Sequence, residues 1–312
     1  RNEDGTFDLR RYHRYSDVSS YKKRYILNYL NTLPAQYINT TTRIEVIQYG
    51  YTDQNRPLVY LKVSSNSSLN KPVIIVEAGI NPREWITIPA ALNVLDGILE
   101  DQRYLDEIEW IVIPVLNPDG YEYTHTNLRL WTKSMSTRSH MGIICPGVNI
   151  NRNFDIDWLH FDSSSSPCSH LYGGVEPFSE IESQLIRDIT QDHGPRIQMY
   201  ISLQNNGGYI SYPWSYERAA SGMFRENYLL ALEMTRAMNE TYNIDVSSVA
   251  FDRASGTSSD YARTNGVLYT YNIDVVDRGN GVIIPEAEIG GIVDDIWRAV
   301  AVAADEMIRL NV

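Results

Sequence analysis

Runs of apolar residues alternate along the chain with stretches that have the apolar periodicity of helices. The run PVIIVEAGI at 72–80 is apolar almost throughout, as expected for a strand that is covered on both faces of a sheet. The segment EIEWIVIPVLNPDG at 107–120 has the same character and ends in a turn signal. Further strands are predicted at 43–52, 57–65, 198–204 and 267–276.

Other stretches repeat apolar residues every three to four positions, which is the period of a helix. One helix is predicted within 16–33, with Ser16 or Asp17 near its N-cap. A second is predicted at 179–193, with a capping-box start at Ser179. The remaining predicted helices lie at 89–101, 223–242 and 290–310.

The order of these elements predicts the fold class. Strands alternate with helices throughout, and no Pro/Gly-rich linker divides the chain. This pattern indicates a single α/β domain over residues 1–312, with a mixed and largely parallel sheet. The region 137–180 is rich in Ser, Gly and Pro and is expected to form a long ordered loop.

Charge and length narrow the classes of partner. The 312 residues carry a formal net charge of −12, which disfavours nucleic acid as a partner because such binding needs clustered cations. No apolar run reaches the roughly 18 residues that a membrane span requires. The sequence starts at Arg1 without Met, which we interpret as a processed mature protein.

Two cysteines and three glycosylation sequons bear on the compartment. Cys145 and Cys168 are either paired in one disulfide or are two free buried thiols. Sequons begin at Asn39, Asn66 and Asn239, in polar stretches suited to a surface. Because sequons and disulfides both occur in secreted proteins, we expect an extracellular, disulfide-bearing glycoprotein.

Five segments of the chain are specific in their order and spacing. They are EAGINPREWITIPA, VLNPDGYEYT, GVNINRNFDIDW, YISLQNNGGYISYPW and SGTSSDYARTNGVLYTYNIDVVDRG. Together they resemble the zinc metallocarboxypeptidases of the pancreatic carboxypeptidase A/B type, over nearly the whole chain. The resemblance implies a single α/β domain, a mixed eight-stranded sheet and an active site at the strand ends. It also implies a mature catalytic domain without the N-terminal propeptide of the family.

The zinc-binding positions of the family are altered in this chain. The His-x-x-Glu motif of the family aligns with Asn81 and Glu84, and Gln204 stands where the second histidine is expected. Amides are weak ligands compared with the imidazole, thiolate and carboxylate groups that hold zinc. We therefore expect no bound zinc and no other cofactor. The histidines present do not match the ligand positions; they are His13, His125, His140, His160, His170 and His193.

The catalytic positions implied by the resemblance also differ. Asp274 aligns with the glutamate that acts as general base, although a shifted alignment places Asn272 there. Thr132 follows Trp131 where the family has its oxyanion-stabilising arginine. Asp252 occupies the position of the mobile tyrosine that covers the substrate. Loss of one preorganised donor alone typically costs about 3 kcal/mol of transition-state stabilisation.

The substrate-anchoring positions are better preserved. Asn151 and Arg152 match the pair that binds the terminal carboxylate of a substrate, and Arg83 matches a subsite arginine. Ser259, at the base of the side-chain pocket, is small and neutral. A guanidinium can bind a carboxylate through two parallel hydrogen bonds. The alternative for Arg152 is an ion pair inside the cleft, with either Glu84 or Asp274.

Two hypotheses follow for the function. In the first, the chain is a secreted pseudoenzyme that has lost zinc and peptidase activity, and its cleft binds a peptide or protein C-terminus or serves a structural or storage role. In the second, it is an active carboxypeptidase with an atypical metal site, such as a hard cation on Glu84, Asp274 and amide oxygens. The number of altered positions favours the first hypothesis.

Overall fold

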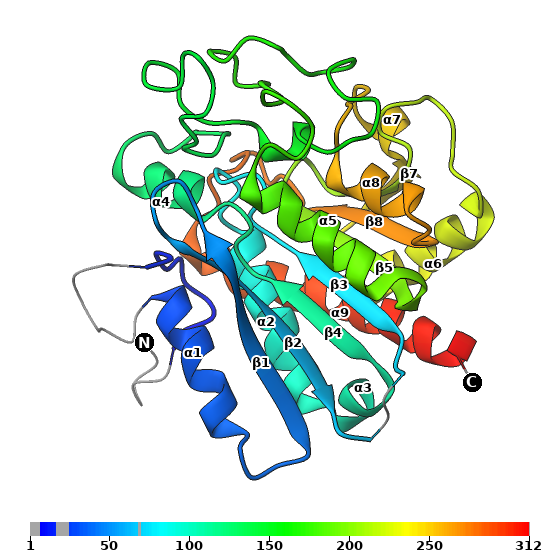
Figure 1. The fold of residues 1–312 in the computed structure, drawn as a ribbon. Coiled ribbons are helices and arrows are strands. Elements are labelled where there is room, and N and C mark those ends of the chain that lie inside the picture. Colours follow the sequence, from blue (N-terminus) through cyan, green and yellow to red (C-terminus); the bar gives the residue numbers. More distant parts are fainter. Residues whose placement is uncertain (1–6, 17–24, 68–69, 312) are drawn as a thin grey trace.

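One eight-stranded sheet forms the centre of the computed structural model, which describes residues 7–16, 25–67 and 70–311 (Figure 1). The strand order is β1-β2-β4-β3-β5-β8-β6-β7, and its middle pairs β4·β3, β3·β5 and β5·β8 are parallel. This confirms the mixed eight-stranded sheet that was expected. The strands are β1 Thr42–Tyr51, β2 Pro57–Ser65, β3 Val73–Glu77, β4 Glu109–Ile113, β5 Ile197–Gln204, β6 Tyr209–Tyr212, β7 Asn243–Val246 and β8 Tyr269–Asp274.

Helices cover both faces of the sheet, with α5 on one side and α2 and α9 on the other (Figure 1). The α-helices are α1 Ile26–Gln36, α2 Thr87–Glu100, α3 Gln102–Glu107, α4 Pro118–Thr126, α5 Ile181–His193, α6 Phe224–Ala237, α7 Ser247–Ala250, α8 Ser258–Thr264 and α9 Glu286–Asn311. Two 3-10 turns, η1 Ile150–Arg152 and η2 Gly194–Arg196, accompany them.

Strand β3 shows why the central strands are apolar throughout. Ile74 and Val76 pack into the core beneath α1, α2 and α9, whereas Val73 and Ile75 pack into the core beneath α5 and α8. Successive side chains of a strand point to opposite faces, so a strand with a core on each face needs apolar residues at every position. Full burial of each such side chain contributes roughly 1.5–3 kcal/mol.

Two predicted helix starts are wrong. The first helix begins at Ile26, and Ser16 lies outside it; Asp17 is outside the described residues. At α5 the N-cap residue is Glu180, whose side chain does not cap the helix, so the capping box at Ser179 does not form. The Ser179 hydroxyl instead donates to Glu180 Oε1 at 3.0 Å. Ser179 Oγ also accepts from Asn153 Nδ2 at 3.0 Å, so a residue of another segment, and not the helix N-terminus, bonds this hydroxyl.

The strands and turns around the sheet also depart in part from the prediction. The strand predicted at 107–120 ends at Ile113, and Pro118 begins helix α4 with Asn117 as its N-cap. Asn117 Oδ1 accepts a hydrogen bond from Gly120 N at 3.0 Å, so the NPDG motif starts a helix rather than a simple turn. Strands β6 and β7 were not predicted, since each has only four residues and too little periodicity to detect.

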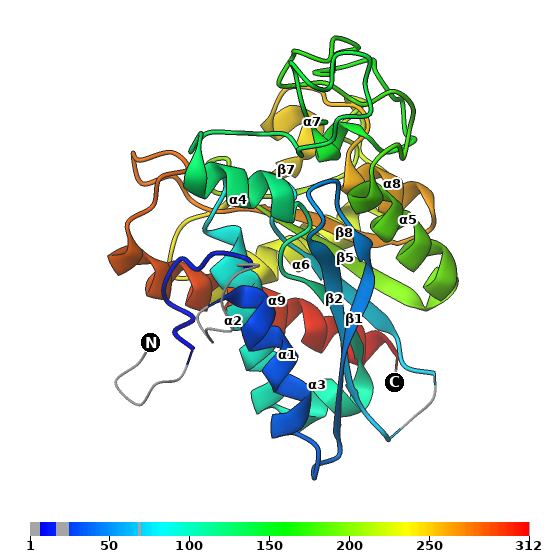
Figure 2. The ribbon, with the colours of Figure 1, turned by 60° about the vertical axis from the view of Figure 1, so that its left-hand side comes forward.

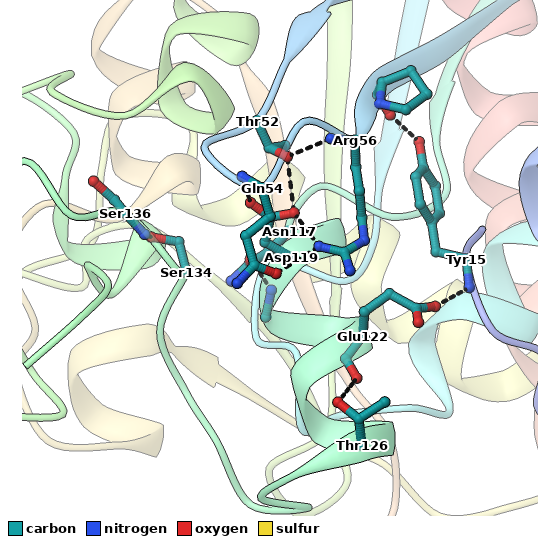
Figure 3. Close-up of polar contacts among 12 residues, drawn as sticks. Tyr15, Thr52, Gln54, Arg56, Asn117, Asp119, Glu122, Thr126, Ser134 and Ser136 are labelled. Atoms are coloured by element: carbon teal, nitrogen blue, oxygen red, sulfur yellow. Dashed lines mark hydrogen bonds and ion pairs between the residues drawn. The ribbon is translucent and has the colours of Figure 1, made fainter. Parts of the chain in front are cut away.

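A polar network joins the N-terminal segment, the β1–β2 turn and α4 (Figure 3). Asp119 accepts hydrogen bonds from Thr52 Oγ1 at 2.8 Å and from Arg56 Nη1 at 2.7 Å. Glu122, one helical turn further, accepts from Tyr15 N at 2.6 Å. These acidic side chains of α4 are buried and paired, so this part of the motif has a structural role.

The loop region 137–180 gathers at one end of the molecule beside α7 (Figures 1 and 2). Cys145 and Cys168 form a disulfide across it, with a Cα–Cα distance of 4.9 Å. The pairing of the two cysteines is thereby confirmed, and the alternative of two free thiols is wrong. Within the described residues, no helix combines the length and the apolarity that a membrane crossing requires.

Candidate functional site

The candidate site lies where the parallel strands β3, β5 and β8 end. Gln204 and Asp274 are paired neighbours at the last positions of β5 and β8. The chain leaves β3 through Gly79, whose φ of +70° and close approach to Val115 exclude a side chain. This turn carries Asn81 and the residues after it to the same edge of the sheet, as expected for a site at the carboxyl ends of parallel strands.

Glu84 is a buried carboxylate held by two hydrogen bonds. It is 5% exposed, and it accepts from Asn81 Nδ2 at 3.2 Å and from Asn205 N at 3.0 Å. Burial raises the pKa of Glu84 to about 7, although the Asn205 N–H and the charge of Arg83 oppose this rise. The side-chain amide of Asn81 therefore acts as a hydrogen-bond donor to Glu84.

Gln204 is bonded to its strand neighbours. Its Nε2 donates to Ser202 Oγ and to Asn272 Oδ1, each at 3.2 Å. Asn272 Nδ2 in turn donates to Ser247 Oγ at 3.2 Å. The Gln204 amide is thus one member of a chain of polar groups that runs across β5 and β8 towards α7.

Asp274 is a second buried carboxylate in this region. It is 2% exposed, and burial raises its pKa well above the ordinary value. The charge of Glu84 raises the pKa of Asp274 further, while a backbone N–H of Asn206 opposes the rise. Both Asp274 and Asn272 line the cavity described next, so both residues considered for the general-base position lie in the site.

A cavity of about 700 Å³ opens beside these strand ends. Seven of the residues singled out by the sequence line it: Asn151, Arg152, Gln204, Asp252, Ser259, Asn272 and Asp274. Among the described residues its lining does not include Asn81, Arg83, Glu84 or Thr132, nor any of the six histidines. The fold therefore brings most of the predicted binding positions together, whereas Asn81 and Glu84, which align with zinc-binding positions of the family, do not line the cavity.

Arg152 is held by an internal ion pair. Its Nη2 lies 2.6 Å from Asp162 Oδ2, its Nε donates to the Asp162 carbonyl at 2.7 Å, and its Nη1 donates to the Asn151 carbonyl at 2.8 Å. The expectation of an ion pair with Glu84 or Asp274 named the wrong partner. Asp162 lies in the Ser-rich loop, where no periodic pattern indicates which residues approach the cleft.

Asn151 and Ser259 are fixed by the start of helix α8. Asn151 Oδ1 accepts from Ser258 N at 3.0 Å, and Asn151 is buried. Ser259 follows in the first turn of α8 and is 1% exposed, yet it lines the cavity. Within the described part of the chain, no group forms a hydrogen bond with its hydroxyl.

The remaining predicted positions lie at or beyond the margin of the site. Thr132 Oγ1 makes a 3.4 Å hydrogen bond to the His170 carbonyl, outside the cavity. Asp252 is exposed at the cavity. Arg83 is half-buried, and its carbonyl accepts from Arg129 Nη1 at 2.6 Å. Arg218, an exposed cation in the cavity lining, was not predicted because no motif marks it.

Comparisons with known proteins agree with this architecture. The chain is 32% identical over 293 residues to carboxypeptidase B of Helicoverpa zea. The aligned region covers 88% of this chain and 68% of that protein. It is also 30% identical to carboxypeptidase B of Astacus astacus, in an alignment that covers 96% of this chain and 97% of that protein. The structure of bovine thrombin-activatable fibrinolysis inhibitor in complex with tick carboxypeptidase inhibitor superposes with a TM-score of 0.86 at 29% identity, covering 97% of this chain and 99% of that one.

A family model described as zinc carboxypeptidase matches residues 26–299. This match spans the sheet from β1 to β8 and about half of α9. It includes the loop with the disulfide and every residue that lines the cavity. The chain therefore belongs to the zinc carboxypeptidase family.

Proposed function

We propose that this chain is a secreted member of the family that neither binds zinc nor cleaves peptides, and that its cleft binds the C-terminus of a peptide or protein. The observation that carries the proposal is the bonding of two amides. Asn81 and Gln204, at the positions of the zinc histidines, both use their nitrogens as hydrogen-bond donors inside the protein.

The donor set does not fit zinc. Zinc sites combine imidazole, thiolate or carboxylate ligands, and here Glu84 is the sole such group among the three ligand positions. Within the described residues, no three His, Cys, Asp or Glu side chains are grouped so that they could hold a metal ion. Amide oxygens are weak, neutral ligands that offset little of the cost of removing water from a divalent cation.

The catalytic groups support the same conclusion. Asp274 is buried beside Glu84, and burial raises its pKa well above the ordinary value, which disfavours the ionised form that a general base requires. Thr132 replaces a cation and lies outside the cavity. Of the two arginines that line the cavity, Arg152 is paired with Asp162 and Arg218 is exposed to solvent.

Support for a binding role comes from the cavity and from the surface. The cavity is retained at about 700 Å³, a size within the range of ligand sites, and Asn151 and Arg152 still line it. The bovine relative was solved with a carboxypeptidase inhibitor bound to it. The disulfide and the exposed sequon residues Asn39, Asn66 and Asn239 support an extracellular location.

Metal analysis and hydrolysis test the proposal. Purified protein is expected to contain clearly sub-stoichiometric zinc and to release no residue from peptides ending in Lys, Phe or Gln. Stoichiometric zinc with turnover would refute it and would favour the active enzyme with an atypical metal site. A variant that restores the residues of the family provides the complementary test. We expect zinc binding to be recovered when four substitutions are combined: Asn81→His, Gln204→His, Thr132→Arg and Asp274→Glu.

A matched control separates the ligand positions from histidine content. Val249→His with Ala254→His adds two histidines to the lining of the same cavity, away from the ligand positions. This control is expected to bind no more zinc than the unmodified chain. Equal zinc binding by the control and the restored variant would show that the alignment of Asn81 and Gln204 with the family ligands is wrong.

A further inference from the structure

Asp162 neutralises the charge of Arg152, a cation that hydrogen bonds hold in place in the cavity lining. Three of the five N–H groups of Arg152 are already bonded, two to Asp162 and one to the Asn151 carbonyl. The side chain of Arg152 is 13% exposed and that of Asp162 is 42% exposed, and both residues line the cavity. A ligand that approaches Arg152 therefore meets Asp162 as well.

This geometry determines which chemical form of a peptide C-terminus binds favourably in the cleft. A free C-terminal carboxylate would replace one carboxylate of the pair or lie beside it, and like charges at this separation repel. A C-terminal carboxamide brings no charge and can still use the two N–H groups of Arg152 that remain. We infer that Asp162 is the specificity-determining residue that makes the cleft accept uncharged, amidated C-termini about as well as free acids. This inference rests on the proposed binding function.

Other charges in the cavity do not restore the preference for an acid. Arg218 lines the cavity and, among the described residues, takes part in no ion pair, but it is exposed and its charge is screened by solvent and salt. Asp252 is exposed in the same lining and carries the opposite charge. Discrimination between acid and amide therefore depends on the fixed pair Arg152–Asp162.

The test compares two peptides that differ only at the terminus, acetyl-Ala-Ala-Ala-Gln with a free carboxylate and the same peptide with a carboxamide. Titration calorimetry measures both dissociation constants for the unmodified chain and for Asp162→Asn. Asn is chosen because Asp162 has a φ of +45°, a conformation that Asn tolerates well. Thermal unfolding of each variant establishes that it is folded.

The unmodified chain is expected to bind acid and amide within about threefold of each other, because the local charge is balanced. Asp162→Asn is expected to bind the acid about tenfold more tightly, with little change for the amide. Asp252→Asn is the matched control, since it removes the same charge from the same cavity without a contact to Arg152. Its ratio of acid to amide affinity is expected to change far less.

A double variant tests whether the change in affinity for the acid depends on the ion pair between Arg152 and Asp162. Adding Arg152→Gln to Asp162→Asn is expected to abolish the gain for the acid. Equal ratios in Asp162→Asn and Asp252→Asn, or a large preference for the acid in the unmodified chain, would overturn the inference and leave the binding function standing. Failure of both peptides to bind any folded variant would overturn the binding function, and the inference with it.

Discussion

Glu77 is the group on which the pH dependence of stability can be tested most directly. It ends strand β3 and is fully buried, and Tyr200 Oη donates to its Oε2 at 3.0 Å. Its Oε1 has no hydrogen-bond partner among the described residues. Burial raises the pKa of Glu77 to about 7, hydroxyls of Ser202 and Tyr200 oppose this, and the charge of Glu84 adds to it. The folded protein therefore favours the protonated acid.

The sign and size of the effect follow from linkage. Between its ordinary pKa of 4.5 and the folded value of about 7, Glu77 is ionised in the unfolded chain and protonated in the folded one. Stability therefore falls as pH rises through this range and levels off above it. One pH unit corresponds to about 1.4 kcal/mol, so the total loss is on the order of 3 kcal/mol.

Glu77→Gln removes this titration and keeps the shape of the side chain. Urea unfolding, followed by tryptophan fluorescence at several pH values from about 4.5 to 8, measures the free energy of unfolding. The unmodified chain is expected to lose roughly 3 kcal/mol relative to Glu77→Gln across that range. Glu100 is exposed at the C-terminal end of α2, so Glu100→Gln is the control. Its free energy of unfolding is expected to change with pH as that of the unmodified chain does. If the free energy of unfolding of Glu77→Gln also changed with pH as that of the unmodified chain does, the assignment of a buried, protonated Glu77 would be refuted.

Three further predictions concern the loop, the core and the pocket. Replacing Cys145 and Cys168 by Ala is expected to lower the free energy of urea unfolding by about 3 kcal/mol, and a loss far below this would mean that the loop is held by its other contacts. Gly97→Ala is expected to destabilise the protein by about 1–3 kcal/mol in the same assay, because its Cβ would overlap the Trp297 indole; a gain in stability, usual for this change in a helix, would contradict the packing. Ser259→Asp is expected to make peptides ending in Lys bind about tenfold more tightly by calorimetry, and no change would show that the side chain of the ligand does not reach Ser259.

The residues that align with the zinc ligands of the family show what a resemblance in sequence can predict. Asn81, Glu84 and Gln204 were assigned from motif order and spacing, and the structure places each at the end of a parallel strand or just beyond it. The hydrogen bonds of the two amides were not predictable. They depend on what the fold brings within reach: Gln204 donates to Asn272 from β8, and Glu84, the partner of Asn81, also accepts from the backbone N–H of Asn205 after β5.

The sequence by itself predicted the central strands and most of the helices, and the altered catalytic positions are a prediction from the family resemblance. These predictions rest on local information, namely the period of 2 residues in strands, the period of 3.6 residues in helices, and short motifs. Only the tertiary structure decided the partner of Arg152. Asp162 lies ten residues away in a loop without periodicity, and its approach depends on the path of that loop between η1 and the disulfide. Long-range charge pairs depend on such paths, so the local pattern of the chain does not contain them.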